Sequence, residues 1–383
     1  MCLGQLVANI VNNSVSIIKG GVAVLDRLTD DFFDELRPEQ FRRLNEEASK
    51  AGIVLPENFE RRCVEALYEN FLKRSGQYSK RTMIQFHSNI GVYFHWCEKK
   101  GHSTCFPCSS KLLEKYMKDK SKKVHRNTLK SHVWAISKAH RVTGYPDPYD
   151  DIYAKGTLAE IIRKKVESRE AVDQARPFRL EHLQKLSEVW NIKNSLLEHR
   201  DLTLLSVAFD TLLRESELVR IRNGDITLNS DGSGTLMIPF TKTNKRGTPD
   251  YAYLSAASVA LLKVQAKNVR CELGNCEVVK DKHLFIAYRR SGRPDRKALS
   301  VNAPLSSNSV DIIFKRAFQA LAMKGKVWTG HSARVGSAIE LHLSGEDILS
   351  LQHSGRWSTS TMPYEYTRQV RSIINKGIKG LRG

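Results

Sequence analysis

The sequence predicts a mainly α-helical protein of two domains, with a small antiparallel β-hairpin or sheet in the C-terminal domain. Three observations support this prediction. The chain has 383 residues, enough for two hydrophobic cores. Apolar residues recur at helical spacing over most of its length. Strand-like alternation is confined to GTLMIPFTKTNKRGTPDYAYLS, residues 234–255, whose centre is rich in turn residues.

The first half of the chain is expected to hold a short extension and one helical domain. Residues 1–55 form the N-terminal extension, with a helix over about 38–51, and residues 56–165 form the domain. Four or five helices are indicated by the amphipathic segments FERRCVEALYENFLKRSG, KRTMIQFHSNIGVYFHWCEKKG, SSKLLEKYMKDK and HRNTLKSHVWAISKAHRVTG, and by residues 158–165.

The second half begins after VESREAVDQARPF, residues 166–178, which has little apolar patterning and is expected to be an inter-domain linker. Residues 179–367 form the second domain, and residues 368–383 form a C-terminal tail. The hairpin is followed by a short strand candidate, HLFIAY, over 283–288. Helices are expected over about 257–267, 308–323, 332–343 and 346–353.

The formal net charge of +20 predicts a polyanionic partner, most often nucleic acid; a generally basic protein is the alternative. Residues 1–55 hold six Lys or Arg against eight Asp or Glu. Residues 110–130 hold eight basic residues against only two acidic ones. The excess positive charge therefore lies beyond the extension.

The cysteines and the apolar segments indicate a cytosolic protein. Seven cysteines, odd in number and scattered, do not form a disulfide framework, and the Cys105–Cys108 pair has no partner pair at zinc-finger spacing. No segment has the roughly 20 continuous apolar residues that span a bilayer. The apolar start of the chain lacks the basic region of a signal peptide. No metal, cofactor or membrane partner is predicted.

Four features of the second domain could carry chemistry. Arg214 lies on an otherwise apolar helix, a costly place for an unpaired charge, and Glu217 could simply pair with it. Lys242 lies at the predicted hairpin tip, where a lysine is usually only solvated. GHSARVG holds His331 and Arg334, which could meet at a helix N-terminus that favours an anion, or only cap that helix.

The fourth feature is GRWSTSTMPYEY, which holds Trp357 and, nine residues later, Tyr366. Together, two arginines, a lysine, a histidine and a tyrosine suit phosphoryl transfer onto tyrosine. Arginine matches phosphate oxygens with a planar fork. A tyrosine hydroxyl, whose pKa is about 10, becomes a nucleophile when a neighbour accepts its proton. A lysine can protonate the leaving oxygen.

These residues, in this order, resemble the signature of the tyrosine recombinases, and most closely that of the Cre-like members. TGHSARVGSA is nearly the histidine–arginine motif of those proteins, and Trp357 stands where many family members have histidine. The resemblance covers about residues 57–371, and it is more specific in the second domain than in the first. It implies a two-domain architecture that forms a clamp on DNA.

The resemblance implies a site-specific DNA recombinase that needs neither metal nor ATP. Tyr366 would attack a phosphodiester and form a 3′-phosphotyrosine, and strand exchange would reverse that step with another 5′-hydroxyl. His331 would accept or share the tyrosine proton, and Lys242 would protonate the 5′-oxygen. Tyr364 and Lys245 remain the alternatives for nucleophile and general acid.

The resemblance also assigns residues that hold the phosphate. Arg214 and Arg334 would clamp the non-bridging oxygens, and Trp357 would donate a hydrogen bond through its indole N–H. Glu217 would orient its neighbours. Arg356 stands where Cre has glycine, and a further phosphate contact is possible there.

The partners implied are double-stranded DNA with an inverted-repeat site and a homotetramer on two such sites, into which a C-terminal helix docks. Residues 110–130 would lie against phosphates. Residues 125–144, with His125, His132 and His140, are the candidate DNA-facing helix, or else a solvated face. A bacterial, phage or plasmid origin fits the family. The alternatives are a type IB topoisomerase-like nicking enzyme and a non-catalytic DNA-binding protein.

Overall fold

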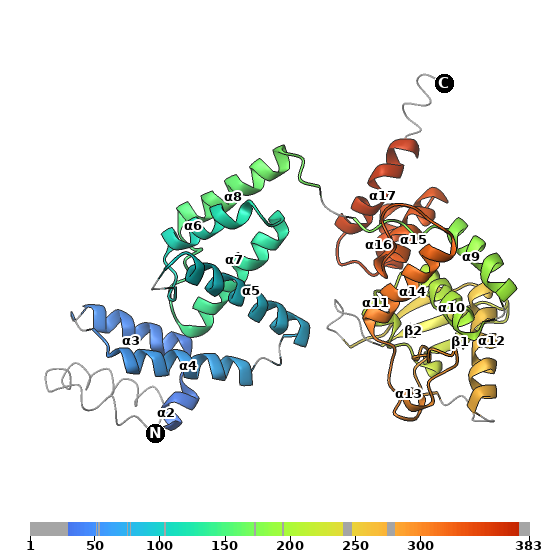
Figure 1. The fold of residues 1–383 in the computed structure, drawn as a ribbon, viewed down its shortest axis with the longest axis horizontal. Coiled ribbons are helices and arrows are strands. Elements are labelled where there is room, and N and C mark those ends of the chain that lie inside the picture. Colours follow the sequence, from blue (N-terminus) through green and yellow to red (C-terminus); the bar gives the residue numbers. More distant parts are fainter. Residues whose placement is uncertain are drawn as a thin grey trace, which may run out of the picture. The chain divides into compact units, whose positions relative to one another are not determined.

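The chain divides into two compact units, Met1–Val172 and Asp173–Gly383, in this computed structural model (Figure 1). The boundary falls inside residues 166–178, the segment expected as a linker. The described residues of the first unit form helices only, and the second unit adds a small sheet, as the expected fold class requires. The structure describes residues 30–50, 52, 54–74, 76, 78–102, 105–171, 174–193, 195–239, 247–273 and 280–374.

The described part of the first unit contains helices that begin at recognisable caps. Ser79 accepts a hydrogen bond from the Thr82 N–H at the start of one helix, and Asp151 accepts two at the start of another. The left-handed Gly144, at φ 80°, ends a third. The helices are α2 (Asp30–Glu35), α3 (Pro38–Lys50), α4 (Glu57–Lys73), α5 (Lys80–Lys99), α6 (Ser110–Ser121), α7 (Arg126–Thr143) and α8 (Ile152–Glu167).

Helix α7 lies at the centre of this unit, in contact with α3, α4, α5, α6 and α8. Two histidines of the candidate DNA-facing helix are therefore core residues rather than surface ones. His132 Nδ1 lies 2.9 Å from the Tyr116 hydroxyl, and His140 Nε2 accepts a hydrogen bond from the Cys108 N–H at 2.8 Å. His125 is the N-cap of the helix. The expectation that these histidines mark a DNA-facing surface is wrong for His132 and His140.

The second unit surrounds a small antiparallel sheet, ordered β1-β2-β3. Strand β2 pairs Leu236 with Ala252 of β3, and the buried Leu236 and Leu254 face the core. The hairpin expected from the sequence is thus present, with one additional strand. The strands are β1 (Ile226–Leu228), β2 (Gly234–Ile238) and β3 (Asp250–Leu254).

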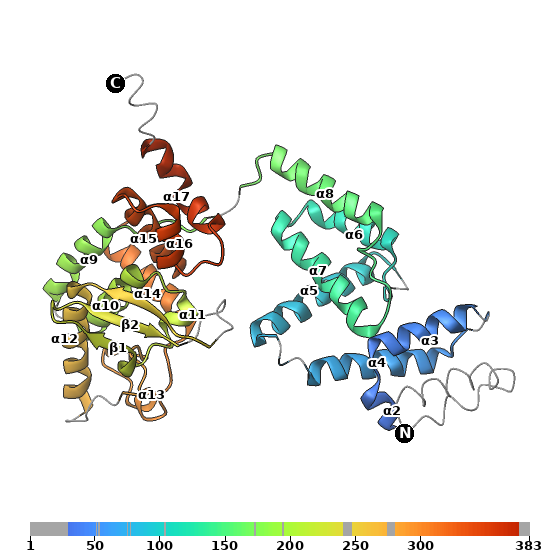
Figure 2. The same ribbon diagram turned by 180° about the vertical axis from the view of Figure 1, so that it is seen from behind.

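The described helices of the second unit cover this sheet and continue beyond it, so that α15, α16 and α17 lie together at one end of the unit (Figures 1 and 2). They are α9 (Leu180–Lys193), α10 (Leu196–Thr211), α11 (Glu215–Leu218), the 3-10 turn η3 (Asn223–Asp225), α12 (Ala256–Leu273), α13 (Arg296–Ser300), α14 (Ser307–Ala320), α15 (His331–Leu343), α16 (Ile348–Ser354) and α17 (Thr361–Ile374).

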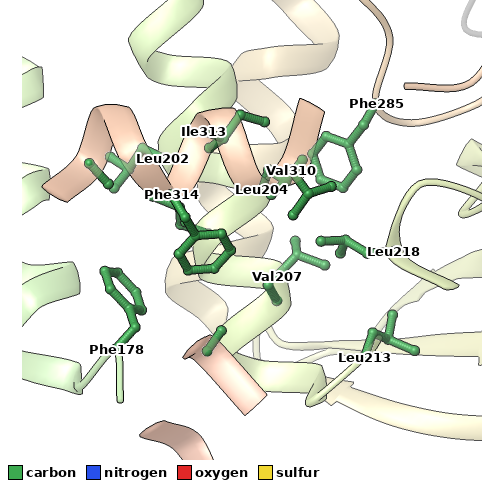
Figure 3. Packing of buried hydrophobic residues seen from close by; sticks show 14 of the residues in the cluster. Phe178, Leu202, Leu204, Val207, Leu213, Leu218, Phe285, Val310, Ile313 and Phe314 are labelled. Carbon is green, nitrogen blue, oxygen red and sulfur yellow. The ribbon is translucent and has the colours of Figure 1, made fainter. Parts of the chain in front are cut away.

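The core of the second unit forms around α10 and α14, and Phe178 belongs to it (Figure 3). Its ring meets that of Phe314 edge-on at 5.6 Å, and its N–H donates to the Ser332 carbonyl. Phe178 is the last residue of the predicted linker, but the chain is already anchored to the second unit at this residue. The segment 283–288, expected as a strand, contributes the buried Phe285 and Ile286 but forms only two isolated bridges, one at each end.

Both ends of the described chain are helical and continue into the two units. Helix α17 continues without a break to Ile374, so the described start of the 368–383 tail is helical. The aromatic cluster of Phe33, Phe41 and Phe59 packs part of the expected extension 1–55 onto α4. Within the described ranges, no helix has the length and apolar character needed to cross a bilayer.

Candidate active site

The first contact of the site joins the start of α15 to α17. His331, the first residue of α15, places Nε2 2.6 Å from the Tyr366 hydroxyl. The two rings meet edge-on, 5.6 Å apart. Tyr366 is only 6% exposed, so bulk water does not compete for this hydrogen bond. The contact supplies what a tyrosine nucleophile needs, a neighbouring group that can accept its proton.

Burial and the neighbouring charges keep the histidine neutral. Burial, together with the nearby Arg334 and Arg214, lowers the pKa of His331 to about 4. Burial also raises the pKa of Tyr366, and the same two arginines oppose that change. At neutral pH the pair is therefore a neutral imidazole hydrogen-bonded to a protonated phenol.

Arg334 lies one turn further along α15 and is 1% exposed. Its guanidinium donates to the carbonyl oxygens of Leu212 and Gly355, the second at 2.5 Å, and stacks 4.3 Å from the centre of the Trp357 ring. Burial, together with the neighbouring Arg214 and Arg356, lowers the pKa of Arg334 to about 9. A buried cation among other cations favours an anionic ligand.

The expectation that Arg214 lies on the apolar helix is wrong, because α10 ends at Thr211 and Arg214 is the N-cap of α11, where it is paired with Glu217. The Glu217 carboxylate accepts one hydrogen bond from the Arg214 backbone N–H at 3.0 Å and one from its Nη1 at 2.8 Å. This is the ion pair that the sequence left as an alternative to a catalytic role. The two are compatible, because the Arg214 side chain remains 26% exposed while the carboxylate that orients it is buried.

Trp357 completes the aromatic wall of the site. Its ring lies 5.7 Å from that of Tyr366, and both belong to one buried cluster with Leu212 and Val335. The preceding Gly355 permits this packing, because a Cβ there would lie 1.8 Å from the Trp357 ring. Trp357 thus contacts both Arg334 and Tyr366.

The two alternatives from the sequence have different outcomes. Tyr364 is 49% exposed, and its ring lies 4.3 Å from the Arg371 guanidinium rather than against His331. Its placement therefore favours Tyr366 as the residue poised to lose a proton. Lys242 and Lys245 both lie outside the described residues.

Sequence reasoning missed the residues that support the turn before His331. Asp311 on α14 accepts a hydrogen bond from the Gly330 N–H at 2.8 Å. Gly330 also lies against Glu215, whose Cγ would be 2.3 Å from an added Cβ. Only the glycine was visible in the sequence, because its partners come from two other helices. In the part of the chain described, no group of three or more His, Cys, Asp or Glu side chains could hold a metal ion.

Comparisons with known proteins agree with this geometry. The model of the phage integrase family matches residues 178–372. Recombinase cre of Escherichia phage P1 is 24% identical over 305 residues, covering 77% of this chain and 86% of that protein. An integrase/recombinase xerD homolog of Selenomonas ruminantium is 25% identical over 281 residues, covering 72% and 77%.

Two solved structures share the fold. The XerH site-specific recombinase bound to palindromic difH substrate matches with a TM-score of 0.57 and 15% identity over 89% of this chain and 88% of that chain. The Tn1549 transposon integrase bound to transposon right end DNA matches with a TM-score of 0.54 and 13% identity over 82% and 99%. Because the family match spans half of the sequence and includes the whole site, the chain belongs to the phage integrase family and is a tyrosine site-specific recombinase, an enzyme that cleaves and rejoins DNA strands.

Proposed function

We propose that this recombinase cleaves DNA with Tyr366 as its nucleophile. The supporting observation is the 2.6 Å contact between His331 Nε2 and the Tyr366 hydroxyl. Neutral His331 accepts the phenolic proton as the tyrosine oxygen bonds to phosphorus. The bond to the 5′-oxygen breaks, which leaves a 3′-phosphotyrosine and a free 5′-hydroxyl once that oxygen is protonated. Lys242 is the proposed donor of this proton.

Three side chains are proposed to stabilise the charge on the phosphate. Arg214 and Arg334 neutralise the non-bridging oxygens, and Trp357 donates through its indole N–H. Glu217 orients Arg214 through the two hydrogen bonds described above. The burial of Arg334 beside other cations supports its role in binding phosphate, because an anion offsets the mutual repulsion of the arginines.

Rejoining reverses the cleavage step. Another strand's 5′-hydroxyl attacks the phosphotyrosine, its proton returns to the donor, and Tyr366 is released as a phenol. The phosphotyrosine linkage conserves the energy of the phosphodiester bond, so the cycle needs no ATP and no metal. This exchange distinguishes recombination from the nicking and relaxation of a type IB topoisomerase.

The DNA-facing surface of the first unit is proposed to lie on the exposed stripe of α7. Trp134 is 42% exposed although the helix around it is buried. Asn127, Lys130 and Trp134 are exposed at helical spacing along this stripe. Lys130 can contact a phosphate, and Asn127 can read a base edge. Further along α7, Lys138 is half-buried over aromatic rings, and the exposed Arg141 is paired with Asp147.

The assembly is proposed to be a homotetramer on two duplex sites, each an inverted repeat gripped by the two units as a clamp. Val370 packs against the buried cluster that contains Trp357 and Tyr366 of the same chain. We therefore propose that the residues after Val370 make the contact between protomers. The enzyme is proposed to act on DNA in the cytoplasm of a bacterium, or on phage or plasmid DNA there.

The test traps the covalent intermediate. Fragmented DNA from around the gene is incubated with the protein without metal or ATP, and adducts are resolved on a denaturing gel. Wild type and Y364F should form an adduct, and Y366F should not, although it still binds the duplex. An adduct retained by Y366F would overturn the assignment. Joined products with exchanged flanks would identify recombination, whereas nicked and resealed DNA alone would favour the topoisomerase-like alternative.

A further inference from the structure

Arg356 has a backbone conformation that most side chains avoid. Its φ is 53°, in the left-handed region, where glycine is accommodated without steric cost. The residue forms the turn between the C-terminus of α16 and Trp357. Nothing in the proposed reaction uses its side chain. Because an arginine here is disfavoured by its backbone, its side chain must contribute something that glycine cannot.

The Arg356 guanidinium ties two segments of the site together. Its Nη2 donates to the Thr211 carbonyl at 2.7 Å, and its Nη1 donates to the Ser354 carbonyl at 3.1 Å. Thr211 is the last residue of α10, three residues before Arg214. The side chain therefore connects the turn that leads into Trp357 with the segment that leads into Arg214.

Arg334 makes a parallel connection between the same two segments. It donates to Leu212 and Gly355, the residues that directly follow Thr211 and Ser354. Leu212 is itself left-handed, at φ 51°, so both segments have a disfavoured backbone where the arginines hold them. The arrangement also brings Arg356 close to the buried Arg334, whose pKa is lowered by burial first and then by Arg214 and Arg356.

We propose that Arg356 is a positioning residue for DNA cleavage, which fixes the segment before Arg214 and the turn before Trp357 so that both side chains meet the phosphate. Arg334 alone cannot do this, because it binds the same segments while it also has to face the substrate. The proposal rests on the proposed function of the site. It predicts that Arg356 affects the rate of cleavage rather than the affinity for DNA.

The test compares R356G with R169G. Glycine at 356 relieves the left-handed backbone and removes both carbonyl contacts, so we expect a folded protein. Its adduct formation in a single turnover at saturating duplex should be about 10- to 100-fold slower than that of wild type. R356K should recover part of the rate, because an ammonium can still bind a carbonyl. Arg169 is an exposed arginine at φ 59°, so R169G makes the same backbone change outside the site and should keep the wild-type rate.

Crystal structures of wild type and R356G without DNA give a second readout. We expect residues 211–214 to be displaced in R356G. An unchanged rate in R356G would overturn the proposal. Superimposable 211–214 segments would also overturn it, and would point to direct contact between Arg356 and the phosphate if the rate still fell. If wild type formed no adduct, the proposed function would fail, while the two crystal structures would still decide the positioning role.

Discussion

The His331 imidazole and the Tyr366 phenol form one hydrogen-bonded pair, 2.6 Å from Nε2 to oxygen, although 35 residues separate them in the chain. The pair exists because α15 and α17 pack side by side and because burial and two arginines keep the imidazole uncharged. A charged imidazolium could not accept the phenolic proton. The environment that keeps His331 uncharged therefore also determines how the protein responds to acid.

The first prediction concerns stability at low pH. The pKa of His331 is about 4 in the folded protein and about 6.5 in an unfolded chain. Between these values the unfolded chain binds the extra proton, so acid favours unfolding. We expect the free energy of unfolding of wild type, minus that of H331Q, to fall by roughly 1.4 kcal/mol per pH unit as the pH drops through this window.

Urea unfolding of both proteins at several pH values measures this difference. Other titrating groups are shared by the two proteins and cancel in the subtraction. A difference that does not change with pH would mean that His331 keeps an ordinary pKa in the folded state. Since Y366F retains the imidazole and its buried surroundings, it should follow the slope of wild type.

The second prediction concerns anion binding. Arg334 is buried near Arg214 and Arg356, and burial and repulsion among these cations lower its pKa. Inorganic phosphate should bind among them and stabilise the folded state, by about 1.4 kcal/mol at ten times its Kd. We expect the melting temperature of wild type to rise more in phosphate than in chloride of equal ionic strength.

The controls separate this site from general salt effects. R214M should lose most of the phosphate-specific increase, and R290M, which removes an exposed arginine elsewhere in the same unit, should keep it. Phosphate also stabilises proteins by exclusion from their surface, and that contribution should be equal in all three proteins. Equal increases in wild type and R214M would argue against an anion site.

The sequence predicted much of the fold because most of it is local. Amphipathic spacing and serine caps identify the helices, and the period change at residues 234–255 identifies the hairpin. Phe178 could not be placed in this way. Its partners, Phe314 and Ser332, lie more than a hundred residues away, and a single apolar residue after a proline has no period.

The site shows the same division between local and distant information. The order of arginine, histidine, tryptophan and tyrosine was readable, because the combination suits phosphoryl transfer onto tyrosine and resembles the tyrosine recombinase signature. The contacts that hold those residues in place could not be predicted from the sequence. Asp311 beneath Gly330, and the carbonyls of Thr211 and Leu212 that receive Arg356 and Arg334, are backbone or distant contacts that no local pattern encodes.

The third prediction concerns Glu217. E217A removes the acceptor for the Arg214 N–H and for its guanidinium. We expect a loss of about 1 kcal/mol in the free energy of unfolding, the usual effect of losing such a cap, and a slower single-turnover adduct formation because Arg214 is no longer oriented. E217Q retains one acceptor oxygen and should fall between E217A and wild type.

D225A is the matched control. Asp225 accepts a hydrogen bond from the Arg222 N–H at 2.8 Å in the same kind of capping arrangement, on the 3-10 turn η3 outside the site. Its loss should lower stability by a similar amount without slowing adduct formation. If D225A and E217A slowed the reaction equally, the effect of Glu217 would be one of stability alone.

The fourth prediction concerns two helical glycines with opposite expected effects. A Cβ on Gly336, in the middle of α15, would lie 1.7 Å from the Phe178 carbonyl oxygen, a backbone atom that cannot move aside. G336A should therefore lower the free energy of unfolding by about 3 kcal/mol. Gly91, in the middle of α5, has nothing within 4 Å of an added Cβ. G91A should raise stability by about 1 kcal/mol.

Urea unfolding followed by tryptophan fluorescence measures both changes. G336A should also slow adduct formation, because relieving the clash shifts α15 and moves His331 away from Tyr366. If G336A were as stable as wild type, the backbone at Phe178 would have to be able to move. The attachment of Phe178 to the second unit would then be weaker than the burial of its ring implies. Gly336 thus allows α15 to lie directly against the backbone of Phe178, and we expect the contact between His331 and Tyr366 to depend on that close approach.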